Sequence, residues 1–134
     1  MDSQHNPIAD VTSTVLYNLQ YQHDWVSLDV HETAHRPLIR GLPPRRLYIH
    51  PDDQIAALER EKTTGEPLDQ TPEFEWVLTV HPEEKWTIKA FSNIFDSIEH
   101  KGLREKRLVL ATVHNDSTVV YYLMHEGMVK PRQN

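Results

Sequence analysis

The sequence has 134 residues, no cysteine and a formal net charge of −6 at pH 7. This length predicts one domain over residues 1–134 with short flexible termini, and the lack of cysteine excludes disulfides, thiolate zinc sites and cysteine nucleophiles. The acidic balance argues against a free-standing nucleic-acid-binding protein, because such proteins need a basic surface to bind phosphate. No apolar stretch is long enough to span a bilayer, so no membrane insertion is expected. The first ten residues are too acidic and polar for a secretory signal, which favours the nucleus or the cytosol.

The first predicted element is a helix over residues 7–22. Asn6 suits the N-cap and Pro7 the first helical position. The apolar stripe of this helix contains Ile8, Val11, Val15 and Leu19. Residues 25–30 then alternate apolar and polar side chains, which predicts a strand.

The middle of the chain is less regular. Residues 35–46 are rich in Pro and Arg, which favours extended and turn structure. A short strand is predicted at 47–49. A charged helix follows, beginning at Asp52 and ending near Gly65.

The last part of the chain predicts a strand at 73–81, a helix at 86–100 with Gly102 as its C-cap, and a hairpin of strands 108–113 and 118–124. The fold class expected from this order is α/β, as one compact domain with a mixed, largely antiparallel sheet and flanking helices.

The final predicted strand carries no charge and is apolar on both faces. It consists of Thr118, Val119, Val120, Tyr121, Tyr122, Leu123 and Met124. Such a strand must be covered on both sides. Either it is a central strand covered by the chain's own helices, or a second protein chain covers one side of it.

One motif predicts a different chemistry. His31, Glu32 and His35 fit H-E-x-x-H, a zinc-protease signature in which two His on one helical face bind the metal and the Glu acts as base. The motif requires a helix, whereas here a predicted strand runs into His31 and Pro37 follows closely. An exposed loop is therefore the favoured interpretation, and a zinc metalloprotease is kept as an alternative.

Two further sets of residues bear on RNA. Tyr, His and Lys side chains together support metal-free RNA cleavage, but no local pattern gathers them. The basic cluster of Arg36, Arg40, Arg45 and Arg46 lies in the Pro-rich stretch. Of these, Arg40, Arg45 and Arg46 are candidates for a weak RNA contact, and a solvated loop with ion pairs is the competing interpretation. A free-standing RNA-binding module is the second alternative function.

Several stretches resemble one known family. They are Asp116-Ser117-Thr118-Val119-Val120-Tyr121-Tyr122, then Glu126-Gly127-Met128, then Pro131-Arg132-Gln133-Asn134, and earlier Gly41-Leu42-Pro43-Pro44. Together they resemble the smallest, non-catalytic subunit of the eukaryotic tRNA-splicing endonuclease, in its fungal form. The order and spacing of the helix and strands over 9–25 and 76–80 agree with that family.

This resemblance implies a fold like the C-terminal nuclease domain of archaeal splicing endonucleases, which are assemblies of four units. In the eukaryotic complex two other subunits carry Tyr/His/Lys triads and cut without a metal, leaving a 2′,3′-cyclic phosphate and a 5′-hydroxyl. The implied role is a structural subunit, not an enzyme and without a cofactor. Residues 45–53 do not match the catalytic block of the family, so no catalytic residue is transferred.

The implied partners are the catalytic subunit that cuts the 3′ splice site, the other two subunits of the heterotetramer, and pre-tRNA through the complex. The resemblance assigns the last strand to subunit pairing, and a homodimer is expected when the chain is isolated. The turn of His114, Asn115, Asp116 and Ser117 is the candidate inter-subunit loop, although it carries only one carboxylate. The implied location is the nucleus, with the cytosolic face of the mitochondrial outer membrane as the alternative.

Overall fold

The computed structural model describes residues 7–33, 35–98 and 105–129. Its elements, in chain order, are α1 (Pro7–Gln22), β1 (Val26–His31), β2 (Leu38–Leu42), α2 (Pro51–Thr64), β3 (Glu75–Val80), α3 (Ile88–Ser97), β4 (Arg107–Val113), β5 (Val119–His125) and the short 3₁₀ helix η1 (Glu126–Met128). No helix among these described residues is long and apolar enough to cross a membrane.

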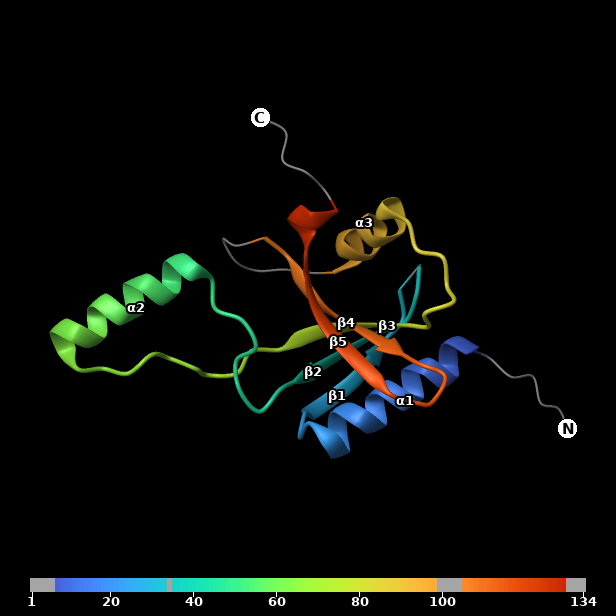
Figure 1. The fold of residues 1–134 in the computed structure, drawn as a ribbon, viewed down its shortest axis with the longest axis horizontal. Helices are drawn as coiled ribbons and strands as arrows, with labels where there is room; N and C mark the ends of the chain where they lie inside the picture. The colour runs from blue at the N-terminus through green and yellow to red at the C-terminus, as the bar shows by residue number, and fades with distance from the viewer. Residues whose placement is uncertain (1–6, 34, 99–104, 130–134) are drawn as a thin grey trace, which may run out of the picture.

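The strands form one mixed sheet in the order β1-β2-β3-β4-β5. All neighbouring pairs are antiparallel except β3 and β4, which are parallel and are connected through α3. Helix α1 covers one face of the sheet and α3 the other, as Figure 1 shows. The fold is therefore α/β with a mixed sheet and flanking helices, as the sequence predicts.

Each face of the sheet has its own core. On the α1 face, the fully buried Val15 and Leu19 belong to one cluster with Ile39 and Val77. On the α3 face, Ile94 and Phe95 of the helix belong to a second cluster. Its other buried members are Leu38, Leu78, Val80, Ile98, Leu108 and Val129. Because β3 and β4 contribute to both clusters, these central strands are apolar on both sides.

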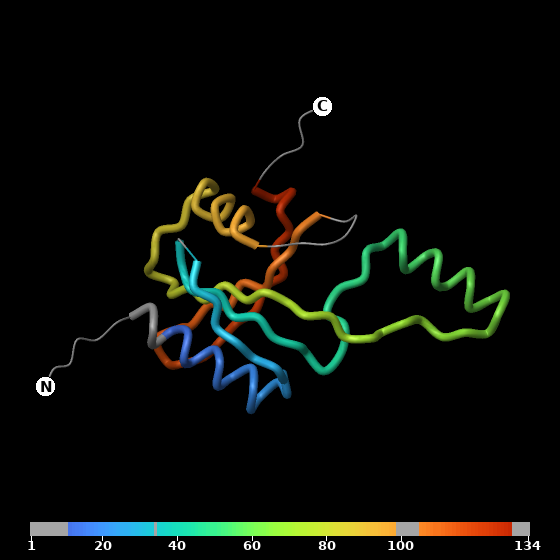
Figure 2. Tube along the Cα trace, turned by 180° about the vertical axis from the view of Figure 1, so that it is seen from behind, coloured from blue at the N-terminus to red at the C-terminus, as the bar shows by residue number. Residues whose placement is uncertain are grey.

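Helix α2 stands apart from both cores. Figures 1 and 2 show it projecting from the sheet on the two segments that connect it to β2 and β3. We refer to residues 43–74 as the α2 arm. Among the residues of α2, Ala57 is buried, whereas Ile55 and Leu58 are 57% and 51% exposed.

The strand predicted at residues 47–49 is wrong, because these residues form no strand. The strand lies instead at Leu38–Leu42, inside the stretch for which extended and turn structure is predicted. Pairing with β1 and β3, and burial of Leu38 and Ile39, outweigh the local Pro and Arg signals there.

The helix predicted at 86–100 is shorter, since Thr87 caps its start and Ile98 is already extended with φ −93° and ψ 129°. The predicted caps Asn6 and Gly102 lie outside the described residues.

Candidate subunit interface

Strand β5 forms one edge of the sheet. Seven residue pairs, from Arg107↔His125 to Val113↔Val119, join it to β4. Within the described residues no strand pairs with its other side, so the backbone groups on that edge face outward. The strand runs one residue beyond the predicted range, to His125, and begins at Val119, so Thr118 lies between the turn and the strand. The interpretation of this strand as a central strand is wrong, because it lies at the edge of the sheet; covering of one side by a second protein chain stays a prediction.

The face of β5 toward α1 is packed by the chain itself. Val119, Tyr121 and Leu123 are partly buried against the α1 core. The Tyr121 hydroxyl donates a hydrogen bond to Asn18 Oδ1 at 2.6 Å. Burial raises the pKa of Tyr121 to about 12, so its phenol stays protonated in neutral solution. Tyr121 is therefore an internal anchor between β5 and α1.

The opposite face of β5 is less well covered. Met124 packs against the α3 core together with Leu110 of β4. Tyr122, which pairs in register with Leu110, remains 57% exposed, and Val120 is half-buried. We refer to the open backbone edge of β5 with Val120 and Tyr122 as the β5 edge surface. It is an apolar strip beside backbone donors and acceptors with which no other strand of the described residues pairs.

This edge lacks the usual protection. Soluble proteins shield edge strands with Lys, Pro, bulges or very short strands. Strand β5 has seven residues, VVYYLMH, and pairs with β4 in unbroken register. An edge of this kind is suited to pairing with a strand of another chain.

The turn between β4 and β5 is ordered by its own hydrogen bonds. Ser117 has a left-handed φ of 69°, and its N–H donates to the His114 carbonyl at 2.9 Å. Hydrogen bonds from the Thr118 hydroxyl and N–H hold the pKa of Asp116 below its ordinary value. Asn115 Oδ1 lies 3.0 Å from His81 Nε2, which ties the turn to the segment after β3. The four turn residues are exposed and project as a defined loop.

At the other end of β5, Tyr48, His125 and Arg107 come together, an arrangement that no sequence pattern indicated. The ring centroids of Tyr48 and His125 are 4.8 Å apart, and the Arg107 guanidinium lies 5.6 Å from the Tyr48 ring. However, Arg107 Nη2 donates to Glu75 at 2.7 Å and to Glu73 at 3.0 Å. Two carboxylates thus accept hydrogen bonds from Nη2 of Arg107 and offset its charge, which makes this cation less able to stabilise charge developing on a phosphate.

Glu75 itself is 2% exposed, and burial raises the pKa of its carboxyl although Arg107 opposes that shift. The buried ion pair fixes the start of β3 against β4, and therefore positions the strand next to β5.

The H-E-x-x-H motif does not form the helix that it requires. His31 ends β1, with its Nε2 3.6 Å from Asp29 Oδ2 and its ring edge-on to Trp76 at 5.0 Å. His35 lies in the following loop, where its N–H and that of Arg36 donate to Thr33 Oγ1. The described residues contain no group of three or more His, Asp or Glu side chains arranged to hold a metal. The zinc-protease geometry is therefore absent from this part of the chain.

The basic cluster is divided by the fold. Arg36 is buried in an ion pair with Glu84, and Arg46 binds Glu73 at 3.3 Å and the Thr71 carbonyl at 3.0 Å. Arg40 stacks on Phe74, with 4.2 Å between the guanidinium and the ring centroid.

Arg45 is exposed. Of the three candidates for RNA contact, Arg46 is already used within the molecule.

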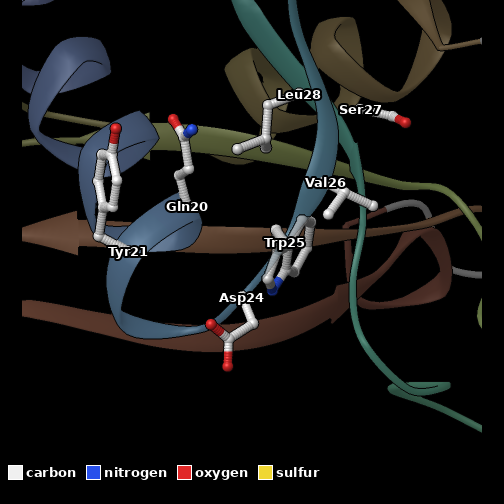
Figure 3. Close-up of a pocket in the computed structure, with 7 residues that line it drawn as sticks. All are labelled: Gln20, Tyr21, Asp24, Trp25, Val26, Ser27 and Leu28. Carbon is white, nitrogen blue, oxygen red and sulfur yellow. The ribbon is translucent and has the colours of Figure 1, made fainter.

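A hollow of about 520 Å³ lies between α1 and β1 (Figure 3). Its lining residues are Gln20, Tyr21, Asp24, Trp25, Val26, Ser27 and Leu28. Asp24 has a left-handed φ of 60° just before β1, and Ser27, with φ 54°, lies inside β1 where the register with β2 shifts between Val26 and Asp29. The lining includes Tyr21, Asp24 and Ser27 as possible acid, base or nucleophile, but Figure 3 shows the Ser27 hydroxyl directed away from the Asp24 carboxylate, so these side chains do not form a catalytic constellation.

The chain is similar to a set of fungal proteins. Residues 14–134 match the model of the family described as Sen15 protein. A probable tRNA-splicing endonuclease subunit tsp-1 of Neurospora crassa is 44% identical, over 92% of this chain and 66% of its own length. A probable tRNA-splicing endonuclease subunit sen15 of Schizosaccharomyces pombe is 26% identical over 99% of this chain and 89% of its own. The tRNA-splicing endonuclease subunit SEN15 of Eremothecium gossypii is 26% identical over 98% of both.

Proposed function

The chain belongs to the Sen15 protein family, and from this premise we propose that it is a non-catalytic structural subunit of a tRNA-splicing endonuclease. Its work is to hold a catalytic subunit, the one that cuts the 3′ splice site, through the β5 edge surface. The relatives that are named as subunits of that endonuclease support membership of the complex.

The observation that carries the proposal is the open edge of β5. A partner strand laid along this edge extends the five-stranded sheet and satisfies its outward backbone groups. The same pairing covers Tyr122 and Val120, and apolar burial contributes about 25 cal/mol per Å². Permanent subunit contacts bury more than about 2,000 Å² in total, so the strip on β5 supplies the centre of such an interface and not all of it.

The non-catalytic role is supported by the environment of Arg107, which lies with Tyr48 and His125 in the one Tyr–His–Arg contact among the described residues. Glu73 and Glu75 both accept from Arg107 there, so the cation is less able to stabilise charge on a phosphate. Any RNA contact by this chain is weak and runs through Arg40 and Arg45, because Arg46 is bound to Glu73. The turn 114–117 reaches a neighbouring subunit as an accessory contact.

When the catalytic partner is missing, two copies of the chain pair through β5. The same edge and the same apolar strip are then presented by both copies, which is the geometry of a two-fold dimer.

The test is a comparison of the assembled and the isolated chain. The tagged chain is purified from its own cells, and the eluate is incubated with an intron-containing pre-tRNA beside the same chain made alone. The proposal expects cleavage with 2′,3′-cyclic phosphate ends by the eluate and no cleavage by the lone chain. Cleavage by the lone chain, or an eluate without the other splicing subunits, contradicts it.

A further inference from the structure

The α2 arm presents a helix whose apolar face its own domain leaves uncovered. Ile55 and Leu58 are three residues apart, so they lie on the same face of α2. They are 57% and 51% exposed, whereas Ala57, which points to another side, is 5% exposed. Figures 1 and 2 show no sheet or second helix lying against α2. The side that remains open is therefore the side with the two large apolar residues.

Local signals stabilise α2, whose one buried residue is Ala57. His50 Nδ1 accepts from the Asp52 N–H at 3.1 Å, and Pro51 occupies the first turn. Gly65 ends the helix in the left-handed conformation with φ 78°, and its N–H donates to the Glu61 carbonyl at 2.8 Å. A lone helix of this length is marginal in water, and most helices are stabilised by burying an apolar face. A capped helix without such burial is prepared for a surface that another molecule provides.

The charge of the α2 arm indicates which kind of partner surface it can bind. Residues 51–73 carry seven acidic and two basic side chains, in a chain of net charge −6. Glu59, Glu61 and Glu66 are exposed on α2 and just after it. An RNA backbone is repelled by this charge, and so is a second copy of the same arm. A basic protein surface is attracted.

The base of the arm adjoins the proposed subunit contact. Tyr48, in the segment entering α2, packs on His125 at the end of β5 with 4.8 Å between ring centroids. Arg46, in the segment before α2, binds Glu73 and the Thr71 carbonyl in the segment after it, and so connects the two segments of the arm. A subunit paired with β5 is therefore close to the point where the arm leaves the sheet.

We propose that the α2 arm is a second docking element, which places Ile55 and Leu58 in an apolar groove rimmed by Lys and Arg on a protein subunit of the same complex. The inference rests on the proposed function for the identity of that complex. The binding mode is that of an amphipathic helix in a groove, with the acidic side chains around it setting orientation and partner choice.

The experiment is a competition for places in the complex. Wild-type and variant chains with different tags are co-expressed with the remaining endonuclease subunits, the complex is purified through a catalytic subunit, and the ratio of the two chains is measured by mass spectrometry. The test variant is Ile55→Gln with Leu58→Gln, which removes apolar surface and keeps helix propensity. The control is Ile88→Gln on α3, an isoleucine that is 67% exposed, compared with 57% for Ile55. Circular dichroism of each isolated variant checks that the helix content is retained.

We expect the double variant to be recovered at least about tenfold less than wild type, as for a central pair of interface residues, and the Ile88→Gln control at parity. The charge reversal Glu59→Lys with Glu61→Lys is expected to lower recovery as well. Parity of the Ile55/Leu58 variant overturns the inference while leaving the proposed function intact. Failure to recover even the wild-type chain overturns the proposed function, and the inference with it.

A photo-crosslinker at Leu58 of the assembled complex identifies the surface that the arm meets. A crosslink to a Lys- and Arg-rich peptide of another subunit supports the inference. Crosslinks to RNA or to a second copy of this chain overturn it.

Discussion

The guanidinium of Arg36 holds the carboxylate of Glu84 in a two-pronged ion pair, and this joins the connection between β1 and β2 to the segment that leads into α3. Arg36 Nη2 lies 2.8 Å from Glu84 Oε1, and the guanidinium also stacks on Trp86 at 5.4 Å. Glu84 further accepts hydrogen bonds from the Trp86 indole and from the His81 N–H. One carboxylate thus binds three partners, the distant Arg36 and the neighbouring His81 and Trp86.

Replacing Glu84 by Gln is expected to lower the free energy of unfolding by about 1–2 kcal/mol. Arg36 is 7% exposed and loses its counter-charge, but Glu84 is 30% exposed, so solvent screening reduces the effect below that of a fully buried pair. Urea unfolding of the variant, with the exposed Glu83→Gln as the control, measures the difference. An unchanged midpoint for Glu84→Gln would show that the ion pair does not contribute to stability.

The contribution of Glu84 should depend on pH. Burial raises the pKa of Glu84, but the hydrogen bonds from Arg36, His81 and Trp86 outweigh this, and the folded-state pKa lies below the ordinary 4.5. Because the folded pKa is depressed, the stabilisation is complete above pH 4.5 and is lost as pH falls through the folded-state pKa.

The stability difference between wild type and Glu84→Gln should therefore be constant from pH 7 to about pH 5 and shrink below it. Unfolding free energies measured across pH 7 to 3 check this course. A stability difference between wild type and Glu84→Gln that grows as the pH falls would contradict a lowered pKa of Glu84 in the folded state.

The two adjacent tyrosines of β5 should behave differently. Removing the hydroxyl in Tyr121→Phe breaks the 2.6 Å bond to Asn18 and should cost about 1 kcal/mol of unfolding free energy. Tyr122→Phe, at an exposed position, should be neutral in the isolated chain. Thermal or urea unfolding of the two variants measures this difference. An equal loss of unfolding free energy in both would refute the assignment of Tyr121 as the internal anchor.

Glycine 41 lies where β2 passes close to β1. A Cβ at this position would come within 2.5 Å of Leu28 Cδ2 and 3.1 Å of the Trp25 ring. We expect Gly41→Ala to lower the unfolding free energy by about 1–3 kcal/mol, because Trp25 is buried and has little room to move.

Gly127→Ala is the control, since the contact there is with the end of the exposed Glu105 side chain, which can rotate away. A larger loss at Gly127 than at Gly41 would contradict this reasoning.

The sequence predicts those elements whose pattern is set locally. Helix α1 has Pro7 at its start and a clear apolar stripe, and the β4–β5 hairpin has two apolar runs around a polar turn; both lie within a residue or two of the expected bounds. Strand β2 is different, because Pro37, Gly41 and Pro43 indicate turns, and only its pairing with β1 and β3 makes it a strand.

The candidate interface could be predicted in part. The charge-free stretch 118–124 indicates a strand that needs covering, but the edge position of β5 and the exposure of Tyr122 depend on the order of strands in the sheet. The exposed face of α2 was not predictable, because a pattern of apolar residues does not reveal whether the domain itself covers them.

The most direct test of the structural-subunit account is the affinity of the chain for the catalytic subunit, measured for wild type, Tyr122→Asp and Val30→Asp. Both substitutions place a charge on an exposed apolar side chain of an edge strand, one on β5 and the other on β1. The account predicts that Tyr122→Asp folds, as judged by circular dichroism, and weakens binding at least about a hundredfold, whereas Val30→Asp binds like wild type. Binding of a folded Tyr122→Asp chain at wild-type affinity would contradict the assignment of the β5 edge surface as the subunit interface.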